Sequence, residues 1–158
     1  MLRADYETQT CSVARALELV GERWTLLILR DLFLGVRRFE AIQQDLGIAR
    51  NVLATRLDKL VAAGIVERRR YNERPPRDEY HLTEKGLDLW PTIVSLMQWG
   101  DRHAPSPGGP PTVLRHRGCG GAVSRHLTCE RCGIELGPRD VQVLAGPGAP
   151  ADHPFAAA

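Results

Sequence analysis

Two amphipathic helix patterns joined by a short turn lie within residues 39–63. In the first pattern Phe39, Ile42 and Leu46 recur at helical spacing, and Gly47 marks the end of the helix. The second pattern runs from about residue 50 to residue 63, and its apolar residues are expected to form a buried stripe. These residues are Leu53, Leu57, Leu60 and Val61. Two short helices with a glycine at the bend predict a helix-turn-helix.

A basic hairpin follows the second helix directly. A strand begins at Ile65, and a second strand with Tyr80 and Leu82 returns after a turn at Pro75 and Pro76. Helix, turn, helix and hairpin in this order predict a winged helix, in which one helix lies in the major groove of DNA. The predicted fold class is therefore mainly α: a winged helix-turn-helix with a small β-hairpin wing and a small Cys-rich extension at the C-terminus.

Positive charge is concentrated in this part of the chain. The whole sequence has a formal net charge of only +2, whereas residues 50–77 contain eight basic and three acidic residues, a net charge of +5. A basic patch neutralises DNA phosphates and releases their counterions, although a charge run on its own is more often a solvated surface. Combined with the helix-turn-helix and the hairpin, the patch favours double-stranded DNA as the partner.

The second helix and the hairpin supply the candidate DNA-binding residues. When the apolar stripe faces the core, polar residues project from the opposite side of the helix, and two arginines flank the stripe. Asn51 can form a bidentate contact with adenine, and the hairpin arginines suit phosphate or minor-groove contacts. Asp58 repels phosphate and is expected to lie off the interface or to pair with a basic residue. The candidates are Arg50, Asn51, Thr55, Arg56, Lys59, Arg68, Arg69, Arg70, Arg74 and Arg77.

Further helices are predicted on both sides of the hairpin. Helical spacing runs from Cys11 to Val20 and again from Trp24 to about Gly35. Beyond the hairpin, Thr83 is expected to cap another helix, and Pro91 is expected to kink or interrupt it. The apolar residues of that helix exceed what one face of a small domain can cover. This helix and the helix that ends at Val20 are therefore predicted to form a homodimer interface. The alternative is that the helix after the hairpin packs on the domain of its own chain. The apolar residues in question are Trp90, Ile93, Val94, Met97 and Trp99.

Composition and periodicity divide the chain into five predicted ranges. Residues 1–10 form an N-terminal arm, and residues 11–103 form the winged-helix DNA-binding and dimerisation domain. Residues 104–112 are rich in Pro and Gly and are expected to be a linker. Residues 113–144 form a zinc-ribbon-like extension, and residues 145–158 are expected to be a disordered tail, because they are poor in packing residues.

The sequence argues against several classes of protein. No apolar run is long enough to cross a bilayer, and the N-terminus lacks an apolar signal-peptide core, so we expect a cytoplasmic protein without a membrane partner. No nucleotide-binding loop, Ser-His-Asp grouping or paired-carboxylate pocket can be argued from the residues, so we do not expect an enzyme. Four cysteines in a cytoplasmic chain indicate metal or redox chemistry and not structural disulfides.

Three of the four cysteines lie in the C-terminal extension. Cys129 and Cys132 form a CxxC motif, and His116 and Cys119 have the same two-residue gap. This spacing suits a tetrahedral ion, and a segment this small needs more than apolar burial to be stable. The expected cofactor is therefore a structural Zn²⁺ ion bound by His116, Cys119, Cys129 and Cys132. A rival fourth ligand is His126, and a redox-active thiol pair or an empty remnant of a metal site are the alternatives.

Motifs along the first two thirds of the chain resemble one known family. They are Cys11, Gly21-Glu22-Arg23-Trp24-Thr25, Arg37-Arg38-Phe39, the segment GIARNVLATRLDKLVAAGIVERR and the wing segment Pro75 to Gly86. Together they make residues 11–103 similar to the HxlR-type helix-turn-helix regulators, relatives of the MarR-type winged-helix proteins. The resemblance implies a homodimeric transcription regulator, a repressor or a dual regulator, that reads a near-palindromic operator and responds to a small-molecule or electrophile effector. In one place the chain departs from the family, because Ala49 and Arg50 stand where Ser and Pro are common, and Ala is a poor helix cap.

Cys11 and the C-terminal cysteines leave other interpretations open. In some members of the resembled family a cysteine at the place of Cys11 senses oxidants or electrophiles, which makes Cys11 a candidate redox sensor; such a role needs an accessible, reactive thiol. The simpler interpretation is a half-buried small residue at a helix start. For the whole chain, the alternatives to DNA binding are a thiol- or metal-responsive redox protein and a protein-interaction module, both using the CxxC-containing region. The redox alternative lacks the strand before the motif and the helix after it that a thioredoxin-like unit requires.

Overall fold

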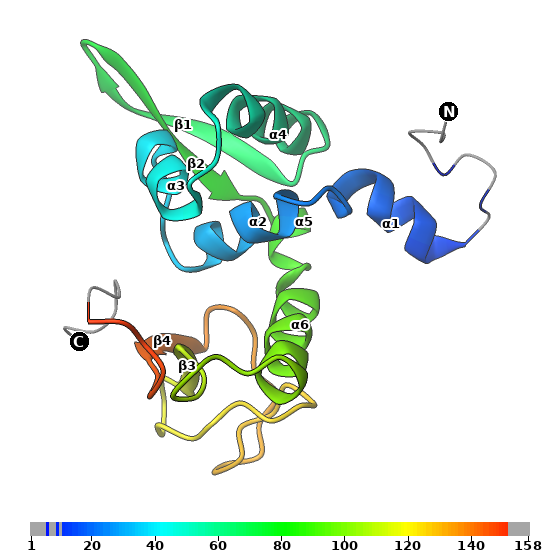
Figure 1. Cartoon of the computed structure of the whole chain (residues 1–158), viewed down its shortest axis with the longest axis vertical. Helices are drawn as coiled ribbons and strands as arrows, with labels where there is room; N and C mark the ends of the chain where they lie inside the picture. Colours follow the sequence, from blue (N-terminus) through cyan, green and yellow to red (C-terminus); the bar gives the residue numbers. More distant parts are fainter. Residues whose placement is uncertain (1–5, 7–8, 10, 152–158) are drawn as a thin grey trace. The chain divides into compact units, whose positions relative to one another are not determined.

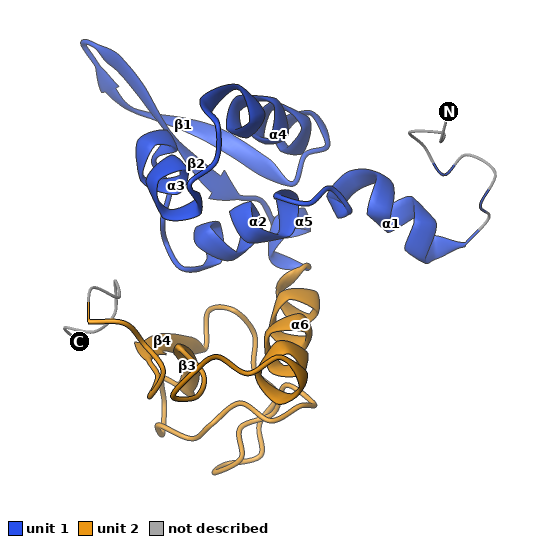
Figure 2. Ribbon diagram, viewed as in Figure 1, with its two compact units in different colours: residues 1–88 blue, residues 89–158 orange. Residues whose placement is uncertain are grey.

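The computed structural model describes residues 6, 9 and 11–151, which form two compact units divided after Asp88 (Figure 2). Most of the predicted N-terminal arm and residues 152–158 of the predicted tail lie outside the described residues. Across the described part of the chain, no helix combines the length and the apolar character needed to span a membrane.

The first unit opens with helices α1 (Ser12–Val20) and α2 (Thr25–Phe33), at the positions that the apolar spacing predicts (Figure 1). Cys11 is the N-cap of α1, and its Sγ accepts a hydrogen bond of 3.4 Å from the backbone N–H of Ala14. The side chains of Ile28 and Leu29 on α2 are completely buried, so α2 is part of the core of this unit.

The helix-turn-helix consists of α3 (Phe39–Leu46) and α4 (Arg50–Ala62). Gly47 ends α3 at a φ of +60°, in the left-handed region that favours glycine because it has no Cβ. The predicted stripe of α4 is confirmed for its three leucines, which are at most 1% exposed, whereas Val61 is only half-buried. These leucines are Leu53, Leu57 and Leu60.

The wing is the antiparallel pair β1 (Val66–Glu73) and β2 (Pro76–Leu82), whose register runs from Val66 opposite Leu82 to Glu73 opposite Pro76. Val66 is buried at the base, whereas the side chains beyond it on β1 point mostly to solvent. The backbone before α3 joins the wing, because the N–H of Tyr80 donates to the carbonyl of Arg37 at 2.8 Å. The hairpin and the helix-turn-helix are therefore parts of one unit.

The helix predicted after the wing is interrupted, as expected from Pro91. It consists of α5 (Glu84–Leu87) and α6 (Trp90–His103), with Pro91 in the first turn of α6. Thr83 caps α5, because its side chain accepts a hydrogen bond from the backbone N–H of Gly86. The first turn of α6 suits Pro91, since the N–H groups in the first turn of a helix have no intrahelical partners.

Helix α6 packs in the second unit, so the division of the structure differs from the boundary expected at residues 104–112. The Nε2 of Gln98 on α6 donates to the backbone carbonyls of Val123 at 3.2 Å and Ser124 at 3.3 Å. These bonds connect α6 to the Cys-rich segment, and this connection is a contact that local composition does not reveal.

The rest of the second unit is built on strands β3 (Thr112–His116) and β4 (Val141–Ala145), which pair antiparallel. The expectation of a disordered tail from residue 145 is wrong at its start. Ala145 pairs with Thr112, and the N–H groups of Gly146 and Gly148 donate to the carbonyls of Pro111 and Pro110. Backbone hydrogen bonds order this stretch, although it contains few apolar side chains.

Candidate nucleic-acid interface and metal centre

The N-terminal end of α4 is exposed and lacks a capping side chain. Ala49 is the N-cap residue and has extended backbone angles, and no side chain of the described residues accepts a hydrogen bond there. The first-turn N–H groups of a helix carry the positive end of the helix dipole and can bind an anion. This helix end therefore has unsatisfied donors at the surface predicted to face DNA.

Three candidate residues lie at this end of α4. The guanidinium of Arg50 stacks over the Phe39 ring at 4.7 Å from its centroid, which holds the arginine between the two helices of the motif. Asn51 is exposed. Thr55 donates its hydroxyl proton to the carbonyl of Asn51 at 2.9 Å, so its methyl group and the lone pairs of its oxygen are left for an outside contact.

Arg56 does not project freely as expected. Its side chain is only 19% exposed, and its Nη2 lies 2.9 Å from Oε2 of Glu22, in the turn between α1 and α2. Lys59, which is more exposed, lies 3.9 Å from the other oxygen of Glu22. Glu22 therefore fixes α4 to the turn before α2. The sequence contains no signal of this role, because the paired residues are more than thirty positions apart.

The arginines in the first half of the wing are paired with acids. Arg68 contacts Asp58 of α4, in agreement with the expectation that Asp58 pairs with a basic residue. Arg70 lies 3.3 Å from Asp78 across the hairpin. Arg69 donates to Glu67, two residues earlier on the same strand, at 2.6 Å. Much of the positive charge that the sequence shows in β1 is thus balanced within the folded unit.

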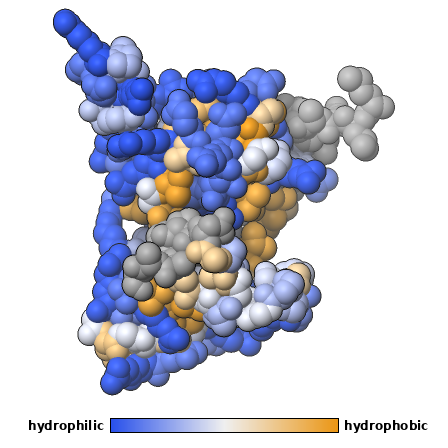
Figure 3. All heavy atoms as spheres, turned by 60° about the vertical axis from the view of Figure 1, so that its left-hand side comes forward, coloured by the Kyte–Doolittle hydropathy of each residue, from blue (hydrophilic) through white to orange (hydrophobic). Residues whose placement is uncertain are grey.

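The tip of the wing carries the exception. Arg74 and Arg77 are exposed, and neither has an acidic partner among the residues that the structure describes. Hydrophilic residues cover the protruding end of the hairpin (Figure 3). An aromatic contact that the sequence did not predict lies nearer the base, where the Arg38 guanidinium stacks over the Tyr71 ring at 4.7 Å. Within the wing, the unbalanced positive charge is therefore concentrated at the tip, and Arg50 on α4 likewise has no acidic partner among the described residues.

A buried carboxylate lies in the core of the same unit. Asp31 on α2 is 0% exposed, and its Oδ1 accepts from Arg30 at 2.6 Å. The other oxygen, Oδ2, has no hydrogen-bond partner in the described residues. Burial raises the pKa of Asp31 to about 6, and the positive charge of Arg30 offsets part of this rise.

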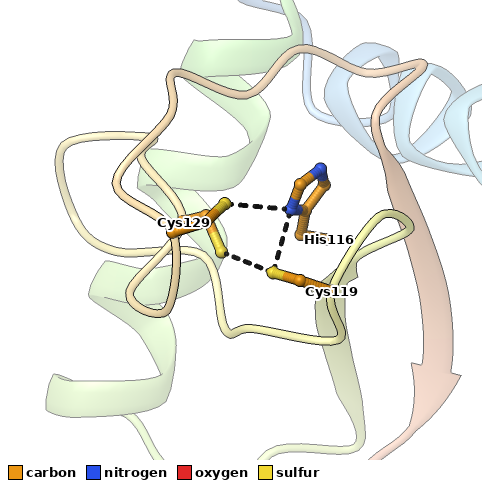
Figure 4. A group of neighbouring side chains, drawn as sticks. His116, Cys119 and Cys129 are labelled. Carbon is orange, nitrogen blue, oxygen red and sulfur yellow. Dashed lines mark hydrogen bonds between the residues drawn. The ribbon is translucent and has the colours of Figure 1, made fainter.

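The four predicted metal ligands converge in the second unit. His116 ends β3, Cys119 follows it in a turn, and Cys129 and Cys132 come from a second turn. Their ligand atoms all lie within 4.8 Å of one another. Figure 4 shows the side chains of His116, Cys119 and Cys129 pointing toward one another. His126 is exposed and is not part of this group, so the rival assignment has no geometric support.

The thiols of this group differ in their surroundings. Cys129 is buried, whereas Cys132 is exposed and Cys119 is half-buried. A hydrogen bond from the backbone N–H of Cys132 is the main cause that lowers the pKa of Cys129, to about 6. A thiol that loses its proton readily suits a metal ligand or a reactive cysteine.

Cys11 lies apart from this group, in the first unit. The structure places it at the start of α1, as expected, but the side chain is exposed and not half-buried. An exposed sulfur is accessible to reagents in solvent, which is one requirement of a redox sensor.

Comparison with known proteins identifies relatives over most of the chain. A profile of the HxlR-like helix-turn-helix family matches residues 19–107. The HTH-type transcriptional regulator Rv3095 of Mycobacterium tuberculosis is 54% identical over 137 residues, which are 87% of each chain. The crystal structure of PA1607, assigned as a transcription factor, has a TM-score of 0.59 and 34% identity, over 92% of this chain and 91% of that chain. The redox regulator HypR in its oxidised form has a TM-score of 0.55 and 30% identity, over 59% of this chain and 97% of that chain.

Proposed function

This chain belongs to the HxlR-like helix-turn-helix family of transcriptional regulators, and we propose that it binds a near-palindromic DNA operator as a homodimer. The observation that carries the proposal is the pairing pattern of the basic patch. Acids balance Arg56 and the arginines of β1, whereas the wing-tip residues Arg74 and Arg77 have no acidic partner in the described part of the chain. Two exposed charges on a protruding hairpin are available to an external polyanion.

In this proposal α4 enters the major groove with its N-terminal end first. Asn51 contacts an adenine edge, and the methyl group of Thr55 contacts a thymine methyl, since the hydroxyl proton of Thr55 is already donated to its own helix. Arg50 and the uncapped N–H groups of the first turn bind phosphates. Arg56 acts indirectly, because its ion pair with Glu22 holds α4 in position against the turn between α1 and α2.

The wing makes contacts of a second kind. Arg74 and Arg77 contact phosphates or the adjacent minor groove, where a charge at a hairpin tip needs no rigid geometry. The arginines of β1 are already held by acids, but their pairs are exposed, and exposed ion pairs contribute only about 0–1 kcal/mol. Phosphates can therefore compete for Arg68, Arg69 and Arg70, with a smaller gain than at the tip.

Exposed apolar side chains on α1 and α6 support the homodimer. On α1, Val13 is 67% exposed and Leu19 46%, and on α6, Leu96 is 50% and Trp99 55% exposed. Large apolar residues exposed on a helix suit an interaction site, and in this proposal a second copy of the same chain covers those of α1 and those of α6 in isologous contacts. Two copies of α4 related by a two-fold axis then read half-sites about 34–36 Å apart.

Footprinting on the promoter beside the protein's own gene tests this function. The proposal predicts two protected half-sites with centres one helical turn of DNA apart, at a protein concentration where sedimentation shows a dimer. A protein that remains a monomer at micromolar concentration contradicts the dimer, and a protein that protects no DNA contradicts the proposal as a whole.

Redox sensing is a second candidate function, and the observation that favours it is the exposed Cys11 at the N-cap of α1. We propose that oxidation or alkylation of this sulfur alters operator affinity, because α1 belongs to the proposed dimer interface. The similarity to HypR, a redox regulator, agrees with this idea. Alkylation with N-ethylmaleimide is expected to change operator affinity in the wild type and not in Cys11→Ser; an equal change in both proteins contradicts the role of Cys11.

A further inference from the structure

We propose that His116, Cys119, Cys129 and Cys132 bind one Zn²⁺ ion in a tetrahedral site that holds the C-terminal segment together. Zinc binding at this site does not depend on DNA binding, because the four residues lie within the second unit alone. The proposal rests on three independent features: the spacing of the ligand atoms, a repeated backbone turn, and the small apolar core of the segment.

Three separations between the ligand atoms are close to those of a tetrahedral zinc site. Nδ1 of His116 lies 3.2 Å from Sγ of Cys119 and 3.4 Å from Sγ of Cys132, and the sulfurs of Cys119 and Cys129 are 3.4 Å apart. Zinc–sulfur and zinc–nitrogen bonds of about 2.3 and 2.0–2.1 Å at tetrahedral angles place neighbouring ligand atoms about 3.6–3.8 Å apart. The observed separations are within about 0.5 Å of these values.

The backbone repeats one turn at both ligand pairs. The N–H of Gly120 donates to the carbonyl of His116, and the N–H of Gly133 donates to the carbonyl of Cys129, each at 2.8 Å. These two glycines have φ values of +73° and +75°, which glycine adopts without the strain of a Cβ. The sequences His-x-x-Cys-Gly and Cys-x-x-Cys-Gly are therefore two copies of one ligand-presenting turn, although their ligand types differ.

Contacts between the two turns bring them face to face. The guanidinium of Arg131 donates to the carbonyl of Cys119 at 2.8 Å, and the N–H of Glu130 donates to the carbonyl of Ala122 at 2.9 Å. Gly121 lies so close to the sulfur of Cys129 that a Cβ at this position would overlap it. Glycine at position 121 thus leaves room for the sulfur of Cys129.

Apolar burial cannot hold this segment by itself. Among the described residues after α6, the buried apolar side chains are those of Cys129, Leu136 and Val141. Small segments with so little core generally require a metal or disulfides. The three cysteines are free thiols, and the 3.4 Å between the sulfurs of Cys119 and Cys129 is well beyond a disulfide bond of about 2.05 Å. Three thiols and one imidazole whose ligand atoms lie within 4.8 Å of one another favour Zn²⁺ among the divalent ions.

Metal analysis of the full-length protein, purified under reducing conditions without chelators, tests the proposal. About one zinc per chain is expected in the wild type, in Cys11→Ser and in His126→Ala, whose changes lie outside the site. Cys119→Ser and Cys132→Ser are expected to lose the metal, and His116→Cys is expected to retain it, because a four-cysteine site also binds zinc. This retention distinguishes loss of a ligand from loss of folding.

A second measurement does not depend on the variants. With zinc bound, alkylation followed by mass spectrometry is expected to label Cys11 first and the other three cysteines only after chelation. After the zinc and the chelator have been removed, added Co²⁺ is expected to give the absorption bands of a tetrahedral thiolate site. Zinc-free protein that takes up no Co²⁺, a disulfide within the cluster in freshly reduced protein, or full zinc content in Cys119→Ser would each overturn the proposal.

Discussion

Replacing Arg77 with alanine should lower both the affinity for DNA and its dependence on salt. Arg77 is exposed and has no acidic partner within the described part of the chain, so nothing inside the protein competes with a phosphate for its charge. Each phosphate contact adds about −0.9 to the slope of log K against log[salt], and a dimer loses two such contacts, or about 1.8 in slope. Between 50 and 200 mM salt, the wild type should therefore lose roughly tenfold more affinity than the variant.

Fluorescence anisotropy with one operator duplex at several salt concentrations measures this slope. Arg125→Ala, which removes the same charge from the second unit, is the matched control and should keep the wild-type slope. Arg69→Ala should change the slope less than Arg77→Ala, because Arg69 must leave Glu67 to reach DNA. An unchanged slope in Arg77→Ala, or a larger change in Arg69→Ala, would refute the reasoning from ion pairing.

Three further predictions concern the stability of the first unit. Ala49→Ser should raise the free energy of unfolding by about 1 kcal/mol in urea denaturation, since it supplies the missing cap of α4; no gain would mean that the helix end is already satisfied. Leu57→Ala should cost about 2–5 kcal/mol, because its side chain is completely buried, and a loss below 1 kcal/mol would contradict the packing. Burial raises the pKa of Asp31 from 3.8 to about 6, so the folded state binds this proton more tightly than the unfolded state does. The free energy of unfolding should therefore fall by up to about 3 kcal/mol as the pH rises from about 4 to 6. Asp31→Asn should flatten this dependence, and urea midpoints that fall as steeply in the variant would exclude Asp31 as the cause.

Periodicity predicted most of the first unit because its helices bury regular apolar stripes. The leucines of α4 and the glycine that ends α3 specify the helix-turn-helix locally, and Thr83 and Pro91 mark the boundaries of α5 and α6 in the same way. Such signals depend on neighbours three or four residues away, and these neighbours are fixed once a helix forms.

The partners of the charged residues could not be predicted in this way. Arg56 has helical spacing suited to DNA contact, yet it is bound to Glu22, whose proximity depends on how α4 packs. The strand at Ala145 was missed for a related reason, since it is stabilised by pairing with Thr112, more than thirty residues earlier. Residue type and spacing identified the four candidate metal ligands that converge in the structure, but the matching turns at Gly120 and Gly133 became visible only in the backbone.

Selection of preferred sequences from random duplexes, compared between the wild type and Asn51→Ala, tests the central claim most directly. If α4 reads bases in the major groove, Asn51→Ala should lose its preference at one position in each half-site, at a cost of about 1–3 kcal/mol for the cognate sequence, and should retain its affinity for random DNA. A variant that selects the same sequences as the wild type would show that α4 does not read the operator through Asn51.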